Sequence, residues 1–325
     1  MRIELITPAG SATRTGNRVT ALRWAKLLRG LGHRVRVGVD YDGVPCDLMV
    51  ALHARRSLPS MTRFKARQPD APLVLALTGT DLYGDIHSDA QARAVLSVAD
   101  RLVLLQPEGL KELPPALHPR CRVILQSVTA PRTRPAKFQR NFTVAVIGHI
   151  RAVKDPLLAA RAARGLPAES RLRVVMAGAA LDPDYEAATR AEARDNPRLR
   201  WVGSLTRGRA LRLLGRSHAL VLSSRSEGGA NVISEALVLG VPVLATDIPG
   251  NVGLLGADYP GLFPVGDAEA LRVLLHRAET NPKWLASLAA WGRHLAPQFT
   301  PQRERAAWAK LLAELSAGSS AGLGR

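Results

Sequence analysis

The feature that most constrains the fold of this chain is a regular alternation of short apolar runs with stretches of helical periodicity. Each apolar run has the length of a buried strand, and helices between such strands are typical of parallel sheets with helices on both faces. The alternation stops at the proline- and charge-rich segment 129–137 and then starts again. A segment without periodicity is typical of a linker. The sequence therefore predicts an α/β protein with two Rossmann-like domains.

The predicted boundaries follow from this alternation. We expect an N-terminal domain at 1–130, a linker at 131–141, a C-terminal domain at 142–299 and a last helix at about 300–316. Strands are predicted at residues 2–7, 34–39, 47–52, 72–78, 101–105, 122–125, 142–147, 172–177, 199–202, 219–223, 242–246 and 261–263. Helices are predicted at residues 18–31, 157–164, 183–195, 207–214, 232–239 and 268–280.

Composition narrows the class of protein. No run of about 18 apolar residues, the length that spans a membrane, is present in the sequence. Residues 1–8 enter a strand directly and lack the apolar core of a signal peptide. The two cysteines, Cys46 and Cys121, lie in or beside apolar runs and are expected to be buried thiols. We therefore expect a cytoplasmic protein without stable membrane insertion.

The net charge of +18 would attract polyanions, so nucleic acid is the obvious alternative partner. The positive charge is mostly arginine, however, and is spread along every segment. Aromatic residues make up only 4% of the chain, which is few for stacking on single strands, and no DNA- or RNA-binding motif is present. A cleft for small anions fits this distribution better. A basic nucleic-acid-binding protein stays the alternative from another class.

The strongest functional pattern is a glycine-containing loop between a strand and a helix in the second half of the chain. Residues 226–237 follow an apolar run and open an amphipathic helix, and Glu227 and Glu235 bracket the glycine pair. The first N–H groups of a helix lack partners, the helix dipole favours anions, and glycines let a phosphate approach the backbone. Carboxylates suit sugar hydroxyls. The combination favours a sugar nucleotide, and a glycine-rich corner that binds nothing is the structural alternative.

Two cations follow the first strand of the second half. Arg151 and Lys154 lie in the segment 148–156, directly beyond the predicted strand end. A diphosphate leaving group needs positive charge nearby, because negative charge grows on it as its bond breaks. Arginine binds phosphate through a planar fork and lysine binds it as a point charge. We expect this pair to meet a diphosphate, and two solvated basic residues are the alternative.

Two loops at strand ends of the first half are candidates for the acceptor side. The loop before the first helix has two glycines, several hydroxyls and two arginines, but lacks a dinucleotide-binding fingerprint. Its candidate residues are Arg14, Thr15, Gly16, Asn17 and Arg18. Beyond another strand end, Thr80 is a further candidate. Asp81 is a candidate base or hydroxyl-binding group, with a helix N-cap as the alternative.

No metal site and no cofactor are predicted besides the co-substrate. The D-x-D patterns at 40–42 and 182–184 are explained by turns and N-caps. The histidines are scattered without ligand spacing, and no nucleophile elbow or P-loop lysine motif is present.

These motifs resemble a known family. The pattern G-x5-K-D after the first strand of the second half is followed by E-G-G-x-N-x3-E-A-L-x2-G-x-P-V-x-A-T. Together they resemble retaining glycosyltransferases of the GT-B fold, family 4. The similarity covers nearly the whole chain. It implies two Rossmann-like domains whose parallel sheets face each other across a cleft, with a last helix that crosses back to the N-terminal domain.

The resemblance also implies roles for individual residues. The residue matching Glu235 holds the nucleotide ribose, the one matching Glu227 faces the donor sugar, and the one matching Lys154 binds the diphosphate. The donor-binding set is Gly148, Arg151, Lys154, Glu227, Gly228, Gly229, Ala230, Asn231, Val232 and Glu235. The catalytic candidates are Lys154, Glu227 and Asp81. The chain departs from the family at His149, where an arginine is usual, and at Thr78, where a histidine near the reacting carbon is usual.

More narrowly, residues 7–25 and 77–83 resemble the selenosugar synthases of selenoneine biosynthesis. That resemblance implies a UDP-sugar donor, UDP-N-acetylglucosamine, with selenophosphate as acceptor and a 1-selenosugar as product after phosphate is lost. Selenophosphate is an anion, which suits Arg14 and Arg18, and its ionised selenium needs no general base. A GT-B transferase acting on an envelope lipid or polysaccharide has the same donor motifs and stays an alternative.

Overall fold

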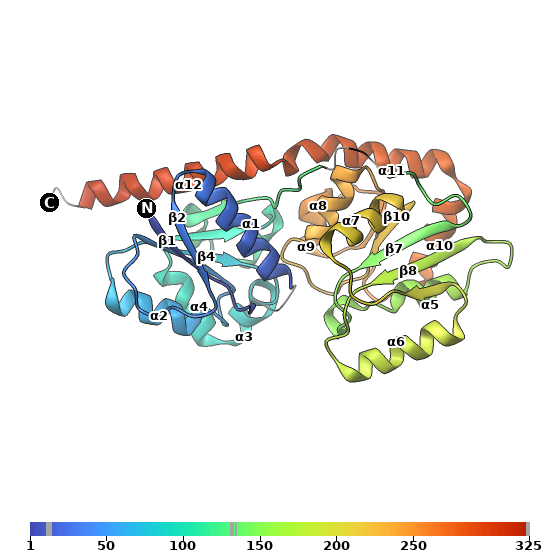
Figure 1. Cartoon of the computed structure of the whole chain (residues 1–325), viewed down its shortest axis with the longest axis horizontal. Helices are drawn as coiled ribbons and strands as arrows, with labels where there is room; N and C mark the ends of the chain where they lie inside the picture. The colour runs from blue at the N-terminus through green and yellow to red at the C-terminus, as the bar shows by residue number, and fades with distance from the viewer. Residues whose placement is uncertain (11–14, 131–132, 134, 323–325) are drawn as a thin grey trace. The chain divides into compact units, whose positions relative to one another are not determined.

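The computed structural model describes residues 1–10, 15–130, 133 and 135–322. The chain divides into two compact units (Figure 1). Unit 1 comprises Met1–Ser127 and Phe299–Arg325, and unit 2 comprises Val128–Gln298. Each unit has a six-stranded sheet whose strands are all parallel, with helices around it. The predicted α/β class with two Rossmann-like halves is confirmed.

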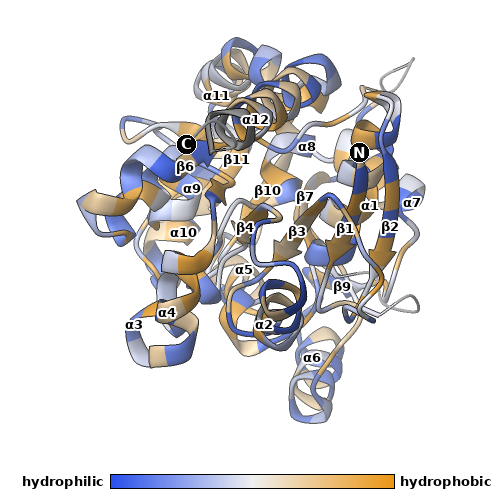
Figure 2. Cartoon of the chain, turned by 90° about the vertical axis from the view of Figure 1, so that its left-hand side faces the viewer, coloured by the Kyte–Doolittle hydropathy of each residue, from blue (hydrophilic) through white to orange (hydrophobic). Residues whose placement is uncertain are grey.

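The sheet of unit 1 has the strand order β2-β1-β3-β4-β5-β6. Its strands are β1 (Arg2–Ile6), β2 (Arg34–Gly38), β3 (Leu48–Leu52), β4 (Leu73–Leu77), β5 (Arg101–Leu104) and β6 (Cys121–Val123). β3 and β4 are apolar and buried at every position, as expected for parallel strands covered on both faces. Figure 2 shows both strands mainly in the colour of hydrophobic residues.

Helices cover both faces of this sheet and create two apolar cores. They are α1 (Gly16–Gly30), α2 (Leu58–Arg67), α3 (Ile86–Ser88), α4 (Ala90–Val98) and α12 (Pro301–Gly322), with the short turns η1 (Asp81–Asp85), η2 (Pro107–Glu112) and η3 (Pro115–Arg120). Phe64 of α2 belongs to one core, and Trp24 of α1 and Trp308 of α12 belong to the other. The rings of Trp24 and Trp308 meet edge to face, with centroids 4.8 Å apart.

A buried carboxylate fixes α12 to α1. Glu304 is 2% exposed and accepts hydrogen bonds from Arg23 Nε at 3.2 Å and Trp24 Nε1 at 2.8 Å. It also accepts the backbone N–H of Ser127 at 2.9 Å. Ser127 is the last residue before the chain leaves unit 1, and Glu304 lies just after its return at Phe299. The Glu304 side chain therefore joins the segment where the chain leaves unit 1 to the segment where it returns. The last helix belongs to the N-terminal half, as predicted.

The sheet of unit 2 has the order β12-β11-β10-β7-β8-β9. Its strands are β7 (Phe142–Ile147), β8 (Leu172–Ala177), β9 (Leu199–Trp201), β10 (Ala219–Leu222), β11 (Val243–Thr246) and β12 (Leu262–Phe263). Its helices are α5 (Leu158–Arg164), α6 (Pro183–Asp195), α7 (Arg207–Arg216), α8 (Asn231–Leu239), α9 (Pro249–Leu255), α10 (Ala268–Thr280) and α11 (Pro282–Leu295), with the turns η4 (Ala152–Lys154) and η5 (Ala296–Phe299). The strand order reverses between β7 and β10, which makes their carboxyl ends the topological switch point.

The predicted strands all form, with ends that differ from the predicted ends by at most two residues. The sequence did not predict α2, α3, α4, α9 and α11. α3 has only three residues, and prolines, glycines or polar residues interrupt the apolar spacing of the others. The last helix continues to Gly322, beyond its predicted end near residue 316, because the alanines and serines there remain compatible with a helix. Cys46 and Cys121 are buried free thiols, as predicted.

Candidate active site

Two loops of unit 2 leave its sheet at the switch point. They follow β7 and β10, which pair with each other in parallel, so both loops start at the same edge of the sheet. Open parallel sheets bind their ligands in this position, beyond the carboxyl ends of the strands. The first loop carries Gly148, Arg151 and Lys154, and the second carries Glu227 and the glycine pair. The fold therefore brings the two predicted donor-binding segments together.

An ion pair joins the two loops. Lys154 Nζ contacts Glu227 Oε1, and Ser224 Oγ donates a hydrogen bond to the same oxygen at 2.6 Å. The side chain of Glu227 is 9% exposed and that of Lys154 is 22% exposed. A buried carboxylate without partners would be strongly destabilising, which explains why Lys154 and Ser224 face it. Because these partners are side chains, the carboxylate and the ammonium can exchange them for a ligand.

The turn that presents Lys154 is held from the second loop. Ser223 Oγ donates to the carbonyl oxygens of Lys154 at 3.1 Å and of Asp155 at 2.8 Å. Asp155 has a φ of +37°, in the left-handed region, which costs on the order of 1 kcal/mol for a residue other than glycine. Its carboxylate pairs with Arg161 at 2.9 Å and Arg225 at 3.2 Å. These contacts set the position of Lys154 before any ligand binds.

Two glycines that the sequence did not single out allow these loops to pack. A Cβ atom on Gly178 would lie 1.8 Å from the carbonyl oxygen of Gly148, and one on Gly250 would lie 1.8 Å from the carbonyl oxygen of Glu227. Only glycine fits such approaches without moving the backbone. Gly178 directly follows β8, and its position just beyond a strand end was the sequence pattern that could have revealed it.

Two further polar atoms at this edge have no hydrogen-bond partner in the described part of the chain. Arg151 N-caps the η4 turn, and its Nε is buried without a hydrogen-bond partner in the described part of the chain. The Oγ of Ser226 is in the same state within the described residues. Buried polar atoms are nearly always satisfied in a folded protein, so both atoms indicate a place for a polar ligand.

The start of α8 favours an anion. Gly228 and Ala230 are buried as they lead into the helix. Ala230 is the N-cap residue and offers no side-chain cap, and the first turn, which contains Asn231 and Val232, has no acid. The end of the helix dipole therefore keeps its positive character. One turn further along α8, Glu235 Oε1 pairs with Arg207 Nη2 of α7 at 3.0 Å. The sequence did not single out Arg207.

In unit 1 the corresponding switch point lies between β1 and β3, where the strand order also reverses. Thr15 is the N-cap residue of α1, and Gly16, Asn17 and Arg18 form its first turn, which has no acid. Thr15 Oγ1 and Arg18 Nε are buried without hydrogen-bond partners among the residues that the structure describes. These predicted acceptor-side residues thus share one helix end. Arg14 lies outside the described residues.

His53 is a site residue that the sequence did not predict. It directly follows β3, is 3% exposed and has a φ of +75°, which is rare for a residue with a side chain. Its Nδ1 accepts the backbone N–H of Arg56 at 3.3 Å, which assigns the ring proton to Nε2, 3.1 Å from Thr80 Oγ1. Burial lowers its pKa below the ordinary value, so the ring is neutral at neutral pH. The carboxyl edge of the unit 1 sheet therefore has a histidine, at position 53 and not at position 78, where the chain has a threonine. A histidine directly after an all-apolar strand was the sequence pattern that could have revealed it.

Asp81 lies in a different environment from Glu227. It is fully buried, and its Oδ1 accepts the backbone N–H groups of Thr78 at 2.9 Å and Gly79 at 2.8 Å. Its Oδ2 accepts the backbone N–H of Ala54 at 2.9 Å. The carboxylate thus fixes the loop after β4 to the loop after β3 and presents Thr80, which is exposed. These contacts give Asp81 a structural task and leave it no open face as a base.

Comparison with known proteins places this architecture in a family. Residues 129–294, just over half of the chain, match the family model described as glycosyl transferases group 1. The match contains both loops of the unit 2 site. This chain belongs to the group 1 glycosyl transferases.

Relatives of this group 1 glycosyl transferase agree with that assignment. Glycosyltransferase 1 domain-containing protein 1 of Xenopus tropicalis is 25% identical over 283 residues, which cover 77% of this chain and 80% of the relative. The solved structure of HepE from Anabaena in complex with UDP and glucose is similar with a TM-score of 0.75 at 16% identity, over 97% of this chain and 100% of that one. Sucrose-phosphate synthase from Thermosynechococcus elongatus reaches a TM-score of 0.77 at 16% identity, over 98% and 100% of the two chains. At such identities the likeness shows the fold, and it confirms the expected GT-B class.

The D-x-D segments of this glycosyl transferase have structural partners. Asp182 caps α6 by accepting the backbone N–H of Asp184 at 2.9 Å, and Asp42 pairs with Arg36. In the described ranges no three histidine, cysteine, aspartate or glutamate side chains gather as metal ligands would. Independence from metal stays a prediction. None of the described helices has the length and apolar character needed to cross a membrane.

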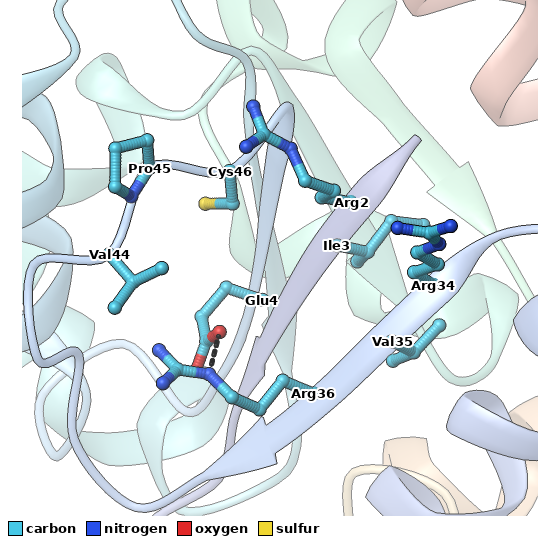
Figure 3. A pocket seen from close by; sticks show the side chains of 9 residues that line it. All are labelled: Arg2, Ile3, Glu4, Arg34, Val35, Arg36, Val44, Pro45 and Cys46. Atoms are coloured by element: carbon cyan, nitrogen blue, oxygen red, sulfur yellow. Dashed lines mark hydrogen bonds and ion pairs between the residues drawn. The ribbon is translucent and has the colours of Figure 1, made fainter.

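A small open hollow of about 260 Å³ lies elsewhere in unit 1 (Figure 3). Its lining comes from the starts of β1 and β2 and the segment before β3, so it lies toward the amino ends of these strands. Arg36 donates to Glu4 at 2.7 Å and also pairs with Asp42, while Arg2 pairs with Asp47. Burial raises the pKa of Glu4 in spite of Arg36. These guanidinium and carboxylate groups pair with one another. We therefore assign them to a structural ion network and do not include the hollow in the candidate site.

Proposed function

We propose that this protein transfers a sugar from a UDP-sugar, UDP-N-acetylglucosamine, to selenophosphate without a metal ion. The observation that carries the donor half is the Lys154–Glu227–Ser224 cluster at the switch point of unit 2, with Glu235 on the adjoining helix. The solved HepE structure with UDP and glucose supports this choice of nucleotide, because its fold is similar over nearly the whole chain.

In this proposal the donor displaces the Lys154–Glu227 ion pair. The positive partners of the diphosphate are the Lys154 ammonium, the start of α8 and Arg151, whose buried Nε has no partner among the residues that the structure describes. Glu227, released from Lys154, accepts hydrogen bonds from the hydroxyl groups of the sugar. Glu235 accepts hydrogen bonds from the hydroxyl groups of the ribose. Lys154 then stabilises the charge that grows on the departing diphosphate.

The acceptor step needs no general base. The selenium of selenophosphate forms a bond to the anomeric carbon while the bond from that carbon to the diphosphate oxygen breaks, and UDP leaves with the electron pair. Water then attacks phosphorus, the P–Se bond breaks, and phosphate and a 1-selenosugar are released. The start of α1, with the N-cap residue Thr15 and with Arg18, and the exposed Thr80 supply positive and hydrogen-bonding groups for such an anion. Arg14, Gly16 and Asn17 belong to the same proposed acceptor segment.

A ligand panel followed by an acceptor panel tests the proposal. UDP-sugars should raise the melting temperature more than GDP- or ADP-sugars, because a ligand at 100 times its Kd stabilises the folded state by about 2.7 kcal/mol. With the preferred donor, UDP release should require selenophosphate, and mass spectrometry should show a sugar with the isotope pattern of selenium. Thiophosphate and inorganic phosphate are the matched anion controls.

The alternatives give different results in the same panel. UDP release with a lipid or polysaccharide acceptor, but not with selenophosphate, would keep the donor half and replace the acceptor. Salt-sensitive binding to DNA or RNA, with no stabilisation by any nucleotide sugar, would favour the basic nucleic-acid-binding alternative.

A further inference from the structure

Arg207 is a charged group at the donor site to which no sequence motif assigns a role. We infer that Arg207 is a positioning residue: it holds Glu235 in the orientation that receives the ribose and offsets the charge of Glu235 against the incoming diphosphate. This inference rests on the proposed function, since it concerns the same donor.

The contact that carries the inference joins the first residue of α7 to the second turn of α8. Arg207 is the first residue of α7, and Glu235 lies in α8. Both helices follow strands, β9 and β10, and therefore begin at the carboxyl edge of the sheet, where the donor is proposed to bind. Arg207 Nη2 lies 3.0 Å from Glu235 Oε1, a hydrogen-bonded ion pair.

The stability of α7 does not explain an arginine at this position. The helix contains Arg207, Arg209, Arg212 and Arg216 and has no acid in its first turn. A cation at the first residue faces the positive end of the helix dipole, which is unfavourable. Thr206 already caps the helix by accepting the backbone N–H of Arg209 at 3.4 Å. The guanidinium of Arg207 therefore has a task outside its own helix, and Glu235 is its partner.

The ion pair is also poorly placed to stabilise the fold. The side chain of Arg207 is 47% exposed, while that of Glu235 is 13% exposed. Solvent screens a pair with one partner in water, so such pairs contribute little to folding stability. The same ion pair has a larger effect on the affinity for a ligand. A carboxylate held by a guanidinium keeps one orientation, so the ribose hydroxyls meet an ordered acceptor and less conformational entropy is lost on binding. Its charge is also offset before a diphosphate approaches.

The test compares Arg207→Ala with Arg209→Ala, which removes the same charge from the same turn. Arg207→Ala should raise the KM for the UDP-sugar and the Kd for UDP about tenfold, the loss expected for one hydrogen bond between charged groups. The kcat should change less than about twofold, because the contact is the same before and during bond breaking. Arg209→Ala should leave all three values near those of the wild type. The melting temperature without ligand should be the same for both variants.

A double variant shows whether Arg207 acts through Glu235. In the Glu235→Gln background, Arg207→Ala should weaken UDP binding by less than about twofold, because the carboxylate that it positions is gone. Arg207→Lys should recover part of the affinity, since it keeps the charge and loses the planar fork.

The outcomes separate this inference from the proposed function. If wild-type protein does not bind UDP or UDP-sugars, the proposed function is wrong. If the wild type binds UDP and Arg207→Ala binds it as tightly as Arg209→Ala does, the inference alone is wrong. The inference would also be wrong if the effects of Arg207→Ala and Glu235→Gln on the free energy of UDP binding were fully additive, because Arg207 would then act independently of the carboxylate.

Discussion

Unit 1 and unit 2 each place a buried carboxylate beyond the carboxyl end of a strand, and the two carboxylates have opposite kinds of partner. Asp81 of unit 1 accepts three backbone N–H groups from two loops. Glu227 of unit 2 is contacted by the side chains of Lys154 and Ser224. The sequence offered both residues as catalytic candidates: Asp81 as an acid beyond a strand end, and Glu227 as the acid that the family resemblance places at the donor sugar.

The difference teaches that burial at the ligand edge does not by itself define a functional acid. Backbone N–H groups cannot move away without unfolding the loops that carry them, so Asp81 is committed to structure. Side chains can rotate toward a ligand, so Glu227 can exchange partners at little cost to the fold. Mutations that separate stability from activity are therefore the direct way to test this comparison.

The largest expected effect is on stability, at Asp81. Asp81→Ala leaves three backbone N–H groups buried without acceptors, and we expect the free energy of unfolding to fall by about 3–5 kcal/mol. Denaturant titration followed by circular dichroism measures this loss. Asp81→Asn keeps one carbonyl acceptor and should lose roughly half as much. If Asp81→Ala instead folds as stably as the wild type while its turnover collapses, Asp81 is the catalytic acid or base that its position in the sequence suggested.

The next effect is on catalysis, at Lys154. Lys154→Ala should lower kcat/KM for the UDP-sugar by roughly 10²–10³-fold, because the ammonium no longer meets the charge on the departing diphosphate. The substitution also leaves Glu227 without its charged partner, so the protein should lose some stability.

The double variant Lys154→Ala/Glu227→Gln separates these two losses. It removes the unpaired charge and should restore the melting temperature toward that of the wild type, while turnover stays low. A wild-type rate for Lys154→Ala at saturating donor would show that the lysine is only a structural partner of Glu227.

The sequence predicted the strands and the unit 2 loops because their determinants are local. Apolar runs specify buried parallel strands, and Lys154, Glu227 and Glu235 lie in motifs of fixed spacing. The remaining contacts join residues far apart in the chain. Ala54 donates to Asp81 across 27 positions, and the Arg207–Glu235 pair links two different helices. Such contacts arise only when the strand order places the loops side by side, so no local pattern reveals them.

The smallest expected effect concerns the pH dependence of two histidines, the buried His53 of unit 1 and the partly buried His218 of unit 2. Burial lowers the pKa of both His53 and His218 below the ordinary value of about 6.5. Below a pH of about 6.5 the ring is protonated in the unfolded chain but stays neutral in the folded protein, so protonation favours unfolding. Each histidine therefore lowers the free energy of unfolding by about 1.4 kcal/mol per pH unit until the pH reaches the pKa of the folded state. His53→Asn and His218→Asn should each flatten the fall in melting temperature between pH 7 and 5.

Their positions predict different effects on turnover, which completes the comparison of the two units. His53 follows a strand and faces Thr80, Asp85 and Arg55 at the ligand edge. His218 precedes β10, where its Nδ1 accepts the backbone N–H of Thr143 at 3.0 Å, at the opposite edge of its sheet. Turnover at neutral pH should therefore fall in His53→Asn and stay near the wild-type value in His218→Asn. Equal turnover in the two variants would mean that His53, despite its unusual backbone conformation, only fills space beside Thr80.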